Sequence, residues 1–454
     1  MDAGHLKDSE RVQFPPGLAN AYYFAVFNAL SFQIVLSSPM VLYAKTLGAS
    51  ATVLGILSAL MPLLVIFQIP AAQYIPRVGF RRFVFTGWGL RVAFIFGMAM
   101  VPLLGVFLDA GSQLALLLML LFGFNLSRGI SSCAWLPWIS ALVPEALRGR
   151  YLARDAACVN LASFVSFILA AVWLGPAPKQ WQFAVLFAFS AVMGMASLSF
   201  LKRMPDTPVP EEDRGAKSPV PWRAMLKHPP FQRVLLTTMT WFVAYGGLQA
   251  FPVAFLKSEI GMSESRILLI TSLSFLGGLS SLWFLGSRLD SIGSRPVIIF
   301  CLSVWLLVLG GWVGLSGRVL SPSMATLLVL HFFMGLLAAL INMANTRLAM
   351  AVIPVMGRTH FFALYSVLAN LAFGLSPVGW GILIDALGTV QTQWLGLSWN
   401  RYTCFFASVA CVLGVALIFA KRLEEPKAAS MEALLREILI QSPQRFWFRL
   451  WPRG

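Results

Sequence analysis

Charged residues are scarce in this sequence. Of its 454 residues only 11% are Asp, Glu, Lys or Arg, while 58% are hydrophobic and the mean hydropathy is +0.77. A typical soluble domain carries about 25% charged residues. The composition therefore excludes a water-soluble globular protein and indicates a chain that crosses a membrane several times.

Acidic side chains are missing from the centre of every long apolar stretch, although the chain has 18 of them. A proton or cation carrier commonly holds a carboxylate in mid-membrane, where burial shifts its pKa. Proton coupling would therefore have to use the substrate itself or His331, the one midspan group that titrates near neutral pH. Facilitated diffusion and exchange stay open, and for His331 we favour a structural role.

Paired cysteines, metal-binding clusters and catalytic motifs are also missing. The 5 cysteines lie in apolar stretches without a CxxC spacing, and no His stands at a metal-ligand spacing. Neither a nucleophile paired with a base nor a phosphate-binding loop occurs. We therefore expect no enzyme activity, no metal and no cofactor.

Apolar stretches that can span a membrane divide the chain, and each needs about 20 helical residues. We expect them near residues 20–44, 51–75, 83–108, 113–143, 151–175, 181–201, 232–256, 264–287, 296–316, 321–353, 360–385 and 401–420. This pattern predicts an all-α integral membrane protein with twelve transmembrane helices.

The chain is predicted to divide into two bundles. Residues 202–231 are rich in Pro and in charges of both signs, which is typical of a linker. The expected parts are a segment at 1–19, a six-helix bundle at 20–201, the linker at 202–231, a second six-helix bundle at 232–420 and a basic amphipathic tail at 421–454. The Arg, Trp and Phe residues of the tail would lie along the membrane surface.

Basic residues indicate the orientation, because Lys and Arg in short loops stay on the cytoplasmic side. Residues 1–19 lack the apolar core of a signal peptide, and a cytoplasmic N-terminus places most of the 34 Lys and Arg inside. We therefore expect both termini in the cytoplasm and the bundle in a plasma membrane, the inner membrane of a bacterium. Topology and anionic lipid headgroups then account for the net charge of +16, so we expect no nucleic-acid partner.

Short motifs recur at a distance of about 210 residues. The segment KTLGAS at 45–50 corresponds to KSEIGMS at 257–263, with Gly48 and Gly261 in register. The segment NLA at 160–162 likewise recurs at 370–372. The repeats predict that the two bundles are pseudo-symmetric. Asn160 and Asn370 would then be either symmetric packing contacts or substrate contacts.

The loop between the eighth and ninth expected spans carries a signature. It reads GSRLDSIGSR, with Gly286, Asp290, Gly293 and Arg295 at a G-x3-D-x2-G-x-R spacing. This loop resembles that of the major facilitator superfamily, and the layout of six spans, linker and six spans extends the resemblance over the whole chain. The resemblance implies a transporter that moves a small organic solute by rocking two halves about a central site. Its partners would be that solute and membrane lipids, and we expect a monomer.

The resemblance also implies a latch on the cytoplasmic side. In the family the carboxylate of this loop faces a helix N-terminus and an arginine, and the contact breaks in each transport cycle. Asp290 would be the acid here, with Arg347 or Arg358 as its partner. The matching loop AQYIPRVGFRR at 72–82 lacks the first Gly and the Asp, so we expect a whole latch only in the second half. The residues that remain in it are Gly79, Arg81 and Arg82.

Arg128 stands in the middle of the fourth expected span, roughly 24 Å from its cytoplasmic end. The resemblance implies that spans 1, 4, 7 and 10 line the central cavity, so its guanidinium could bind the carboxylate or phosphate of an anionic substrate. Alternatively, backbone carbonyls, Asn125, Ser131 or a neighbouring helix satisfy it. For Arg91 we favour a structural pair or a side chain that extends to the membrane surface.

Polar and aromatic side chains on the presumed lining spans complete the candidate substrate site. Trp241, Tyr245 and Gln249 are four residues apart, so they share one helix face. The candidates are Arg128, Asn28, Gln33, Trp241, Tyr245, Gln249 and Asn342.

Two alternatives stay open at this point. The many aromatic residues and the Trp-rich tail would also suit a lipid or amphiphile transporter of the same fold. The degraded loop at 72–82 is compatible with a protein that keeps the fold but serves as a receptor or assembly factor.

Overall fold

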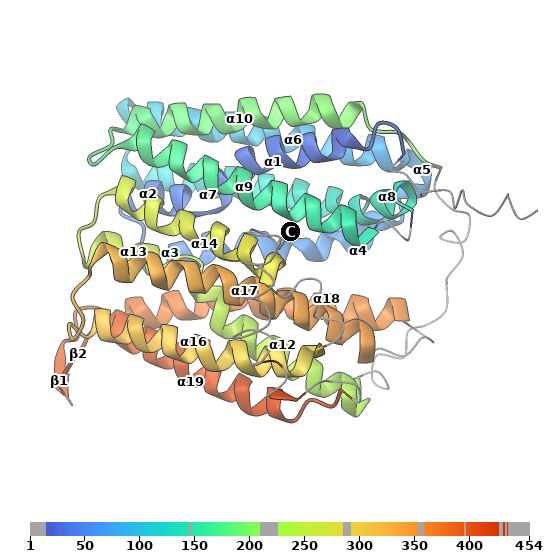
Figure 1. Ribbon diagram of the computed structural model, residues 1–454. Helices are drawn as coiled ribbons and strands as arrows, with labels where there is room; N and C mark the ends of the chain where they lie inside the picture. The colour runs from blue at the N-terminus through green and yellow to red at the C-terminus, as the bar shows by residue number, and fades with distance from the viewer. Residues whose placement is uncertain are drawn as a thin grey trace, which may run out of the picture.

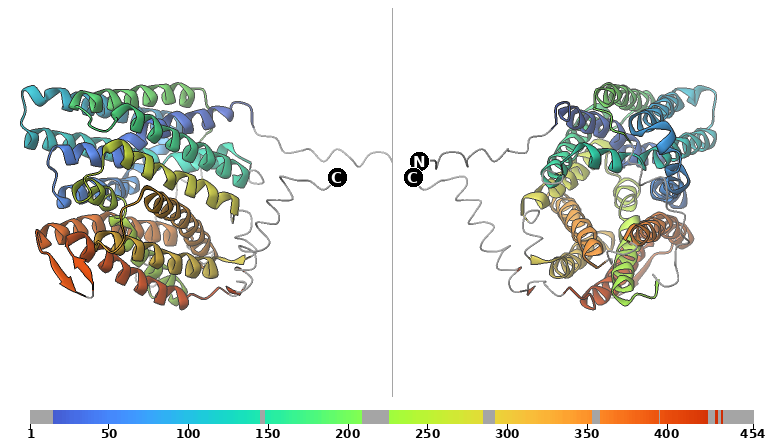
Figure 2. Two further views of the ribbon diagram at one scale, coloured as in Figure 1. Left: turned by 60° about the vertical axis from the view of Figure 1, so that its left-hand side comes forward. Right: turned by 90° about the vertical axis from the view of Figure 1, so that its right-hand side faces the viewer.

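Long helices run side by side in two groups, the first half of the chain above and the second half below in Figure 1. The computed structural model describes residues 15–144, 148–208, 226–284, 292–352, 358–394, 396–425, 430, 431 and 434. Figure 2 shows, from one end, that the helices surround the middle of the molecule. The predicted all-α membrane fold is confirmed.

The first half consists of helices whose apolar sequences suit lipid on one side and protein on the other. They are α1 (Ala19–Leu36), α2 (Ser38–Thr46), α3 (Ala51–Leu63), the 3-10 turn η1 (Leu64–Phe67), α4 (Gln68–Ala72), α5 (Ile75–Val78), α6 (Phe80–Met100), the 3-10 turn η2 (Val101–Val106), α7 (Ala110–Ser132), α8 (Trp135–Leu142), α9 (Arg148–Leu174) and α10 (Gln180–Lys202).

The second half repeats this order. It consists of α12 (Pro229–Gly247), α13 (Phe251–Ser258), α14 (Glu264–Phe284), α16 (Ser294–Ser316), α17 (Met324–Val352), α18 (Arg358–Leu387), the strands β1 (Thr392–Trp394) and β2 (Leu397–Trp399), and α19 (Arg401–Lys421). Among the described residues, 11 helical segments are long and apolar enough to cross a membrane. Helix α14 takes the remaining place, packed between α9 and α17.

A break interrupts the first helix of each half at the same place. Ser37 is extended, with φ −134° and ψ −156°, and Pro39 follows as the second residue of α2. In the second half α12 ends at Gly247, and Pro252 is the second residue of α13. Proline lacks an amide hydrogen, so it fits the first turn of a new helix better than the interior of a continuous one. Both halves therefore start with a discontinuous helix.

The two halves meet along two helix pairs, α3 with α18 and α9 with α14. Glycines permit the close approach of the first pair. A Cβ atom on Gly55 would overlap the Pro377 carbonyl oxygen, and one on Gly381 would overlap that of Ala51. This seam brings the halves together around a central cavity.

The bundle has two distinct ends. The hairpin end carries the antiparallel pair β1 and β2, in which Thr392 pairs with Trp399, and the α5 end carries α5 and α8 (Figure 1). The hairpin was not anticipated from the sequence. It connects α18 to α19, and its turn contains Gly396 at a φ of 74°, a conformation that favours glycine.

Candidate functional site

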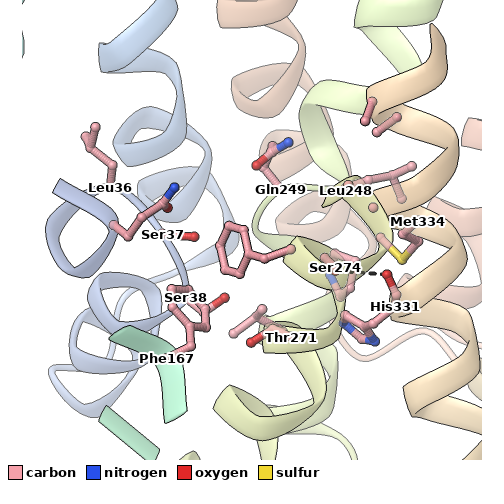
Figure 3. A pocket seen from close by; sticks show the side chains of 18 of the residues that line it. Leu36, Ser37, Ser38, Phe167, Leu248, Gln249, Thr271, Ser274, His331 and Met334 are labelled. Atoms are coloured by element: carbon pink, nitrogen blue, oxygen red, sulfur yellow. Dashed lines mark hydrogen bonds between the residues drawn. The ribbon is translucent and has the colours of Figure 1, made fainter. Parts of the chain in front are cut away.

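A cavity of about 380 Å³ lies where the two halves meet. Its walls come from α1, α2, α3 and α9 of the first half and from α12, α13, α14 and α17 of the second. In Figure 3 Ser37, Ser38 and Phe167 lie across the cavity from Thr271, Ser274 and His331. Both helix breaks open onto it, since Ser37 and Pro252 are lining residues.

Four of the predicted substrate residues line this cavity. They are Gln33, Tyr245, Gln249 and Asn342, and they come from both halves. Gln33 lies in the first half, and the other three lie in the second half. The structure thus brings together side chains that are more than 300 positions apart in the chain, from Gln33 to Asn342.

Trp241 supports the cavity from behind. Its side chain is 1% exposed and stacks on Tyr245 at 4.9 Å between ring centroids, with 14° between the planes. The Trp305 ring meets the Trp241 ring edge-on, with 5.6 Å between the centroids. Tyr245 and Gln249 line the cavity, but the three residues do not share one helix face as predicted, because α12 ends at Gly247 and Gln249 lies in the break that follows.

Asn28 and Arg128 lie away from the cavity wall. Asn28 accepts a hydrogen bond of 3.3 Å from the Trp88 indole Nε1. Within the described part of the chain, the Arg128 guanidinium makes no hydrogen bond or ion pair. Asn125 and Ser131 donate instead to carbonyls of their own helix, at 2.9 and 2.7 Å.

Arg91 is held by aromatic rings. Its side chain is 3% exposed, so it does not extend to the membrane surface. The guanidinium carbon lies 4.9 Å from the centroids of both Trp88 and Phe124. Cation–π contacts of this kind stabilise a buried guanidinium, and Arg128 is near enough to repel it electrostatically.

His331 is fixed by the backbone and lines the cavity. Its Nδ1 lies 3.0 Å from the Leu327 carbonyl oxygen, and its ring meets Trp312 edge-on at 5.4 Å. A carbonyl accepts only, so Nδ1 carries the proton and Nε2 of the neutral ring is an acceptor. The Nδ1 atom is thus used within the helix, and the Nε2 atom is the ring nitrogen that remains for a ligand of the cavity.

Asn160 and Asn370, the repeated pair, make the same bond. Each Nδ2 donates to a carbonyl one turn earlier, that of Ala156 at 2.9 Å and that of Ser366 at 2.8 Å. Asn160 also lines the central cavity, whereas Asn370 lines a second pocket. The two asparagines are thus equivalent in the repeat, but their side chains face different pockets.

The carboxylate of Glu425 contacts the N-terminus of α16 and the side chain of Arg347, which is the arrangement expected of the latch. Its Oε2 accepts from the backbone N–H of Ser294 and Arg295, both at 2.8 Å, and its Oε1 lies 2.6 Å from Arg347 Nη1. Gly293, at a φ of 90°, starts the helix. Gly286 and Asp290 lie outside the described residues, as does the side chain of Arg358.

Glu425 was missed from the sequence, although a signal for it exists. The stretch LKRMPD at 201–206 begins with the last two residues of α10, and AKRLEE at 420–425 begins with the last two of α19. This match places Asp206 and Glu425 in register. In the first half Arg81 Nε lies 3.4 Å from Asp206 Oδ2, with both side chains close to half exposed. Gly79 starts α6 at a φ of 83°, and Arg82 is exposed. The Arg81–Asp206 pair of the first half is therefore more exposed to solvent than the Arg347–Glu425 pair of the second half.

Hydrogen bonds join the two halves at the hairpin end. The Asp385 carboxylate, at the end of α18, accepts from the backbone N–H of Ala51 at 2.9 Å and of Thr52 at 2.7 Å, the first residues of α3. Ser265 N–H donates to the Gly175 carbonyl at 3.3 Å, again across the halves. A carboxylate at a helix N-terminus is stabilised by free N–H groups and by the helix dipole.

A second pocket, of about 280 Å³, lies between α3, η1 and α4 on one side and α18 on the other. Its lining is mostly apolar, and Ile66 and Ile69 are 48% and 59% exposed at its rim. Gln68 bonds to Ser132 nearby, at 2.6 Å. This pocket thus lies between the two halves and has exposed apolar side chains in its lining.

The sequence profile described as Major Facilitator Superfamily matches residues 22–252 and 248–452. The chain belongs to the major facilitator superfamily. It is therefore a multi-pass integral membrane protein with the fold of this superfamily's transporters.

Solved structures share that fold at low sequence identity. A D-xylose–proton symporter has a TM-score of 0.69 and 14% identity, with 90% of this chain and 97% of that one covered. A nucleoside transporter has a TM-score of 0.67 and 13% identity, with 90% and 100% covered. A bacterial homologue of the human lysosomal transporter Spinster has a TM-score of 0.57 and 13% identity, with 96% and 97% covered.

One relative matches only part of the chain. Autophagy-related protein 22-2 of Aspergillus niger is 23% identical over 256 residues, which are 50% of this chain and 40% of the relative. The chain thus matches less than half of that protein's length.

Proposed function

We propose that the protein is a secondary transporter that moves a small organic solute across the membrane by alternating access. The observation that carries this proposal is the cavity itself. Both halves contribute to it, both discontinuous helices break at it, and hydrogen bonds join the two halves at the hairpin end. Rocking the halves about such a site would expose it to each side in turn.

The α5 end would face the cytoplasm, with both chain termini. The structure would then correspond to a state shut on the outside by Asp385 and its partners. Opening that side must break the two hydrogen bonds from α3 to Asp385. Glu425, Arg347 and the N-terminus of α16 would hold the second half together on the cytoplasmic side.

Access to the cavity from both sides tests this proposal. Gln249→Cys, in a variant whose 5 native cysteines are replaced by Ala, puts one thiol on the cavity wall. A membrane-impermeant maleimide should label it in right-side-out and in inside-out vesicles. Labelling from one side alone would contradict alternating access and favour a receptor or assembly factor with this fold.

A second candidate function, transport of a lipid or amphiphile, is favoured by the apolar pocket between α4 and α18. An acyl chain could enter from the bilayer past Ile66 and Ile69. Ile69→Trp would fill the rim. If the protein carries amphiphiles, this change should abolish the thermal stabilisation by a lysophospholipid, while Ile418→Trp, on the exposed surface of α19, should not.

A further inference from the structure

We propose that the central cavity selects a small neutral solute that carries several O–H or N–H donors, such as a sugar, a polyol or a nucleoside, and rejects anions. The proposal rests on the proposed transport function and adds the class of solute. It replaces the anionic substrate that Arg128 suggested, because Arg128 does not line the cavity.

One wall of the cavity offers hydrogen-bond acceptors. The Thr271 hydroxyl donates to the Ile267 carbonyl at 2.9 Å, and the Ser274 hydroxyl donates to the His331 carbonyl at 2.9 Å (Figure 3). A hydroxyl has a single hydrogen, so each keeps only lone pairs for a ligand. With Nδ1 of His331 bonded to Leu327, the ring likewise leaves an acceptor. These groups would bind donors and repel the oxygens of a carboxylate or phosphate.

Side-chain amides stand on the other walls. The side chains of Gln33 and Asn342 make no hydrogen bond within the described part of the chain, and that of Gln249 lies beside the Tyr245 hydroxyl. Each amide offers both N–H donors and a carbonyl acceptor. A solute hydroxyl is also donor and acceptor at once, so it matches an amide in either direction. Several such pairs around one cavity favour a solute with several hydroxyl or amide groups.

Charge is missing from the described lining, which contains no Lys, Arg, Asp or Glu. Moving an ion from water into such a site costs several kcal/mol unless an opposite charge is paired with it. A neutral solute avoids this cost. The absence of a carboxylate disfavours cations for the same reason.

Aromatic rings complete the fit. Phe32, Phe167, Phe275 and Tyr245 line the cavity, and Phe167 meets Phe275 edge-on at 4.9 Å across the two halves. Flat apolar rings suit the C–H face of a sugar or the plane of a nucleobase. The volume of about 380 Å³ lies within the usual range of ligand pockets, about 300 to 1,000 Å³.

Matched neutral and charged compounds test the proposal. The purified full chain would be titrated with D-glucose, gluconate and glucosamine, and with uridine and uridine monophosphate, while its thermal unfolding is followed by tryptophan fluorescence. We expect stabilisation by glucose, uridine or both, and none by their charged counterparts. Equal or greater stabilisation by a charged counterpart would overturn the proposal, as would the lack of any stabilisation by the neutral compounds.

A nearly isosteric variant tests the acceptor wall. Thr271→Val removes the hydroxyl, and the loss of one hydrogen bond should raise the Kd of the bound compound about fivefold. Thr240→Val is the matched control, because the Thr240 hydroxyl bonds in the same way to the Leu236 carbonyl but is exposed and outside the cavity. Ser274→Ala, with Ser303→Ala as its control, keeps the test decisive if a Thr271 variant does not fold. Unchanged affinity in both cavity variants would exclude the acceptor wall.

The two levels of the proposal fail separately. Labelling of the Gln249→Cys thiol from one side alone would remove transport and leave the class of bound solute to the titrations. Labelling from both sides, with binding of anions instead of neutral compounds, would retain transport and remove the proposed selectivity.

Discussion

Glu425 and Arg347 form an ion pair between residues 78 positions apart, with 2.6 Å between Oε1 and Nη1. Their side chains are only 9% and 27% exposed, and the second carboxylate oxygen caps α16. One acid thereby joins the segment after α19 to the start of α16 and to the last turns of α17. This triple contact makes it the strongest candidate for a latch among the described residues.

Glu425→Gln should therefore destabilise the protein. It removes a largely buried charge from an arginine and from two backbone N–H groups, so we expect a loss of about 2 kcal/mol in unfolding free energy, measured by thermal unfolding. Glu424→Gln is the control, because its side chain is 67% exposed and pairs with Arg233 at the surface. That control should cost less than about 1 kcal/mol. Equal losses in the two variants would contradict the special role of Glu425.

Asp206→Asn tests the corresponding pair of the first half. Asp206 and Arg81 are 46% and 43% exposed, and water screens their attraction. We expect the unfolding free energy to fall by less than about 1 kcal/mol. A loss as large as that of Glu425→Gln would show that the two latches are equivalent despite the altered loop at 72–82.

Asp385→Asn should open the hairpin end more often. The change weakens the charge-assisted contacts to the N-terminus of α3, which join the two halves. Labelling of the Gln249→Cys thiol from the hairpin side should become several-fold faster.

Asp109→Asn is the matched control for that experiment. Asp109 caps α7, its own helix, through the N–H groups of Gly111 and Ser112 at 2.9 and 3.2 Å. Its substitution removes a capping carboxylate without touching the contact between halves, so the labelling rate should stay the same. Equal acceleration by both changes would mean that general loosening, and not the Asp385 contact, controls access.

Arg128→Gln should leave the unfolding free energy within about 1 kcal/mol of wild type, because its guanidinium has no hydrogen-bond or ion-pair partner among the residues that the structure describes. Arg91→Gln should lower it by about 1 to 2 kcal/mol, since the guanidinium loses its contacts with Trp88 and Phe124. Thermal unfolding measures both. If Arg128→Gln also abolished binding of the neutral compounds, the cavity would not be the whole substrate site.

Acid should weaken the cap of α7. The hydrogen bonds from Ser112 and Gly111 hold the pKa of Asp109 below its ordinary value. The capping contribution is therefore complete above the unfolded pKa of about 3.9, and it is lost as the pH falls through the lower folded value. The unfolding temperature of wild type should fall more than that of Asp109→Asn over this acid range. Parallel curves for the two proteins would exclude this contribution.

Much of the fold was predictable because it depends on local sequence. Apolar stretches of span length must be helical in a bilayer, since helices satisfy their own backbone hydrogen bonds. Gly48 and Gly261, matched by the repeat, do adopt the same kind of turn, with φ of 80° and 68°. Gly293, a residue of the loop signature, precedes the first residue of α16 and has a φ of 90°.

The site was only partly predictable, because a sequence shows which helix carries a residue but not where its face turns. Asn28 and Gln33 lie on the same helix, α1, yet only Gln33 lines the cavity. Trp241 likewise lies outside it, whereas Gln249, which follows the break after Gly247, lines it. Thr271 and Ser274 were overlooked, since the eighth span was not expected to line the centre.

What the sequence by itself determined was the class of protein: its composition, its repeat and its loop signature identify a membrane protein of twelve helices in two halves. What only the tertiary structure decided was which charges meet and which do not. Glu425 joins Arg347 and Asp385 joins Thr52, 333 positions away, while Arg128 is left without a partner among the described residues. Burial in lipid follows from the composition of each segment, but such contacts form between segments far apart in the chain, so only the packing of the helices determines them.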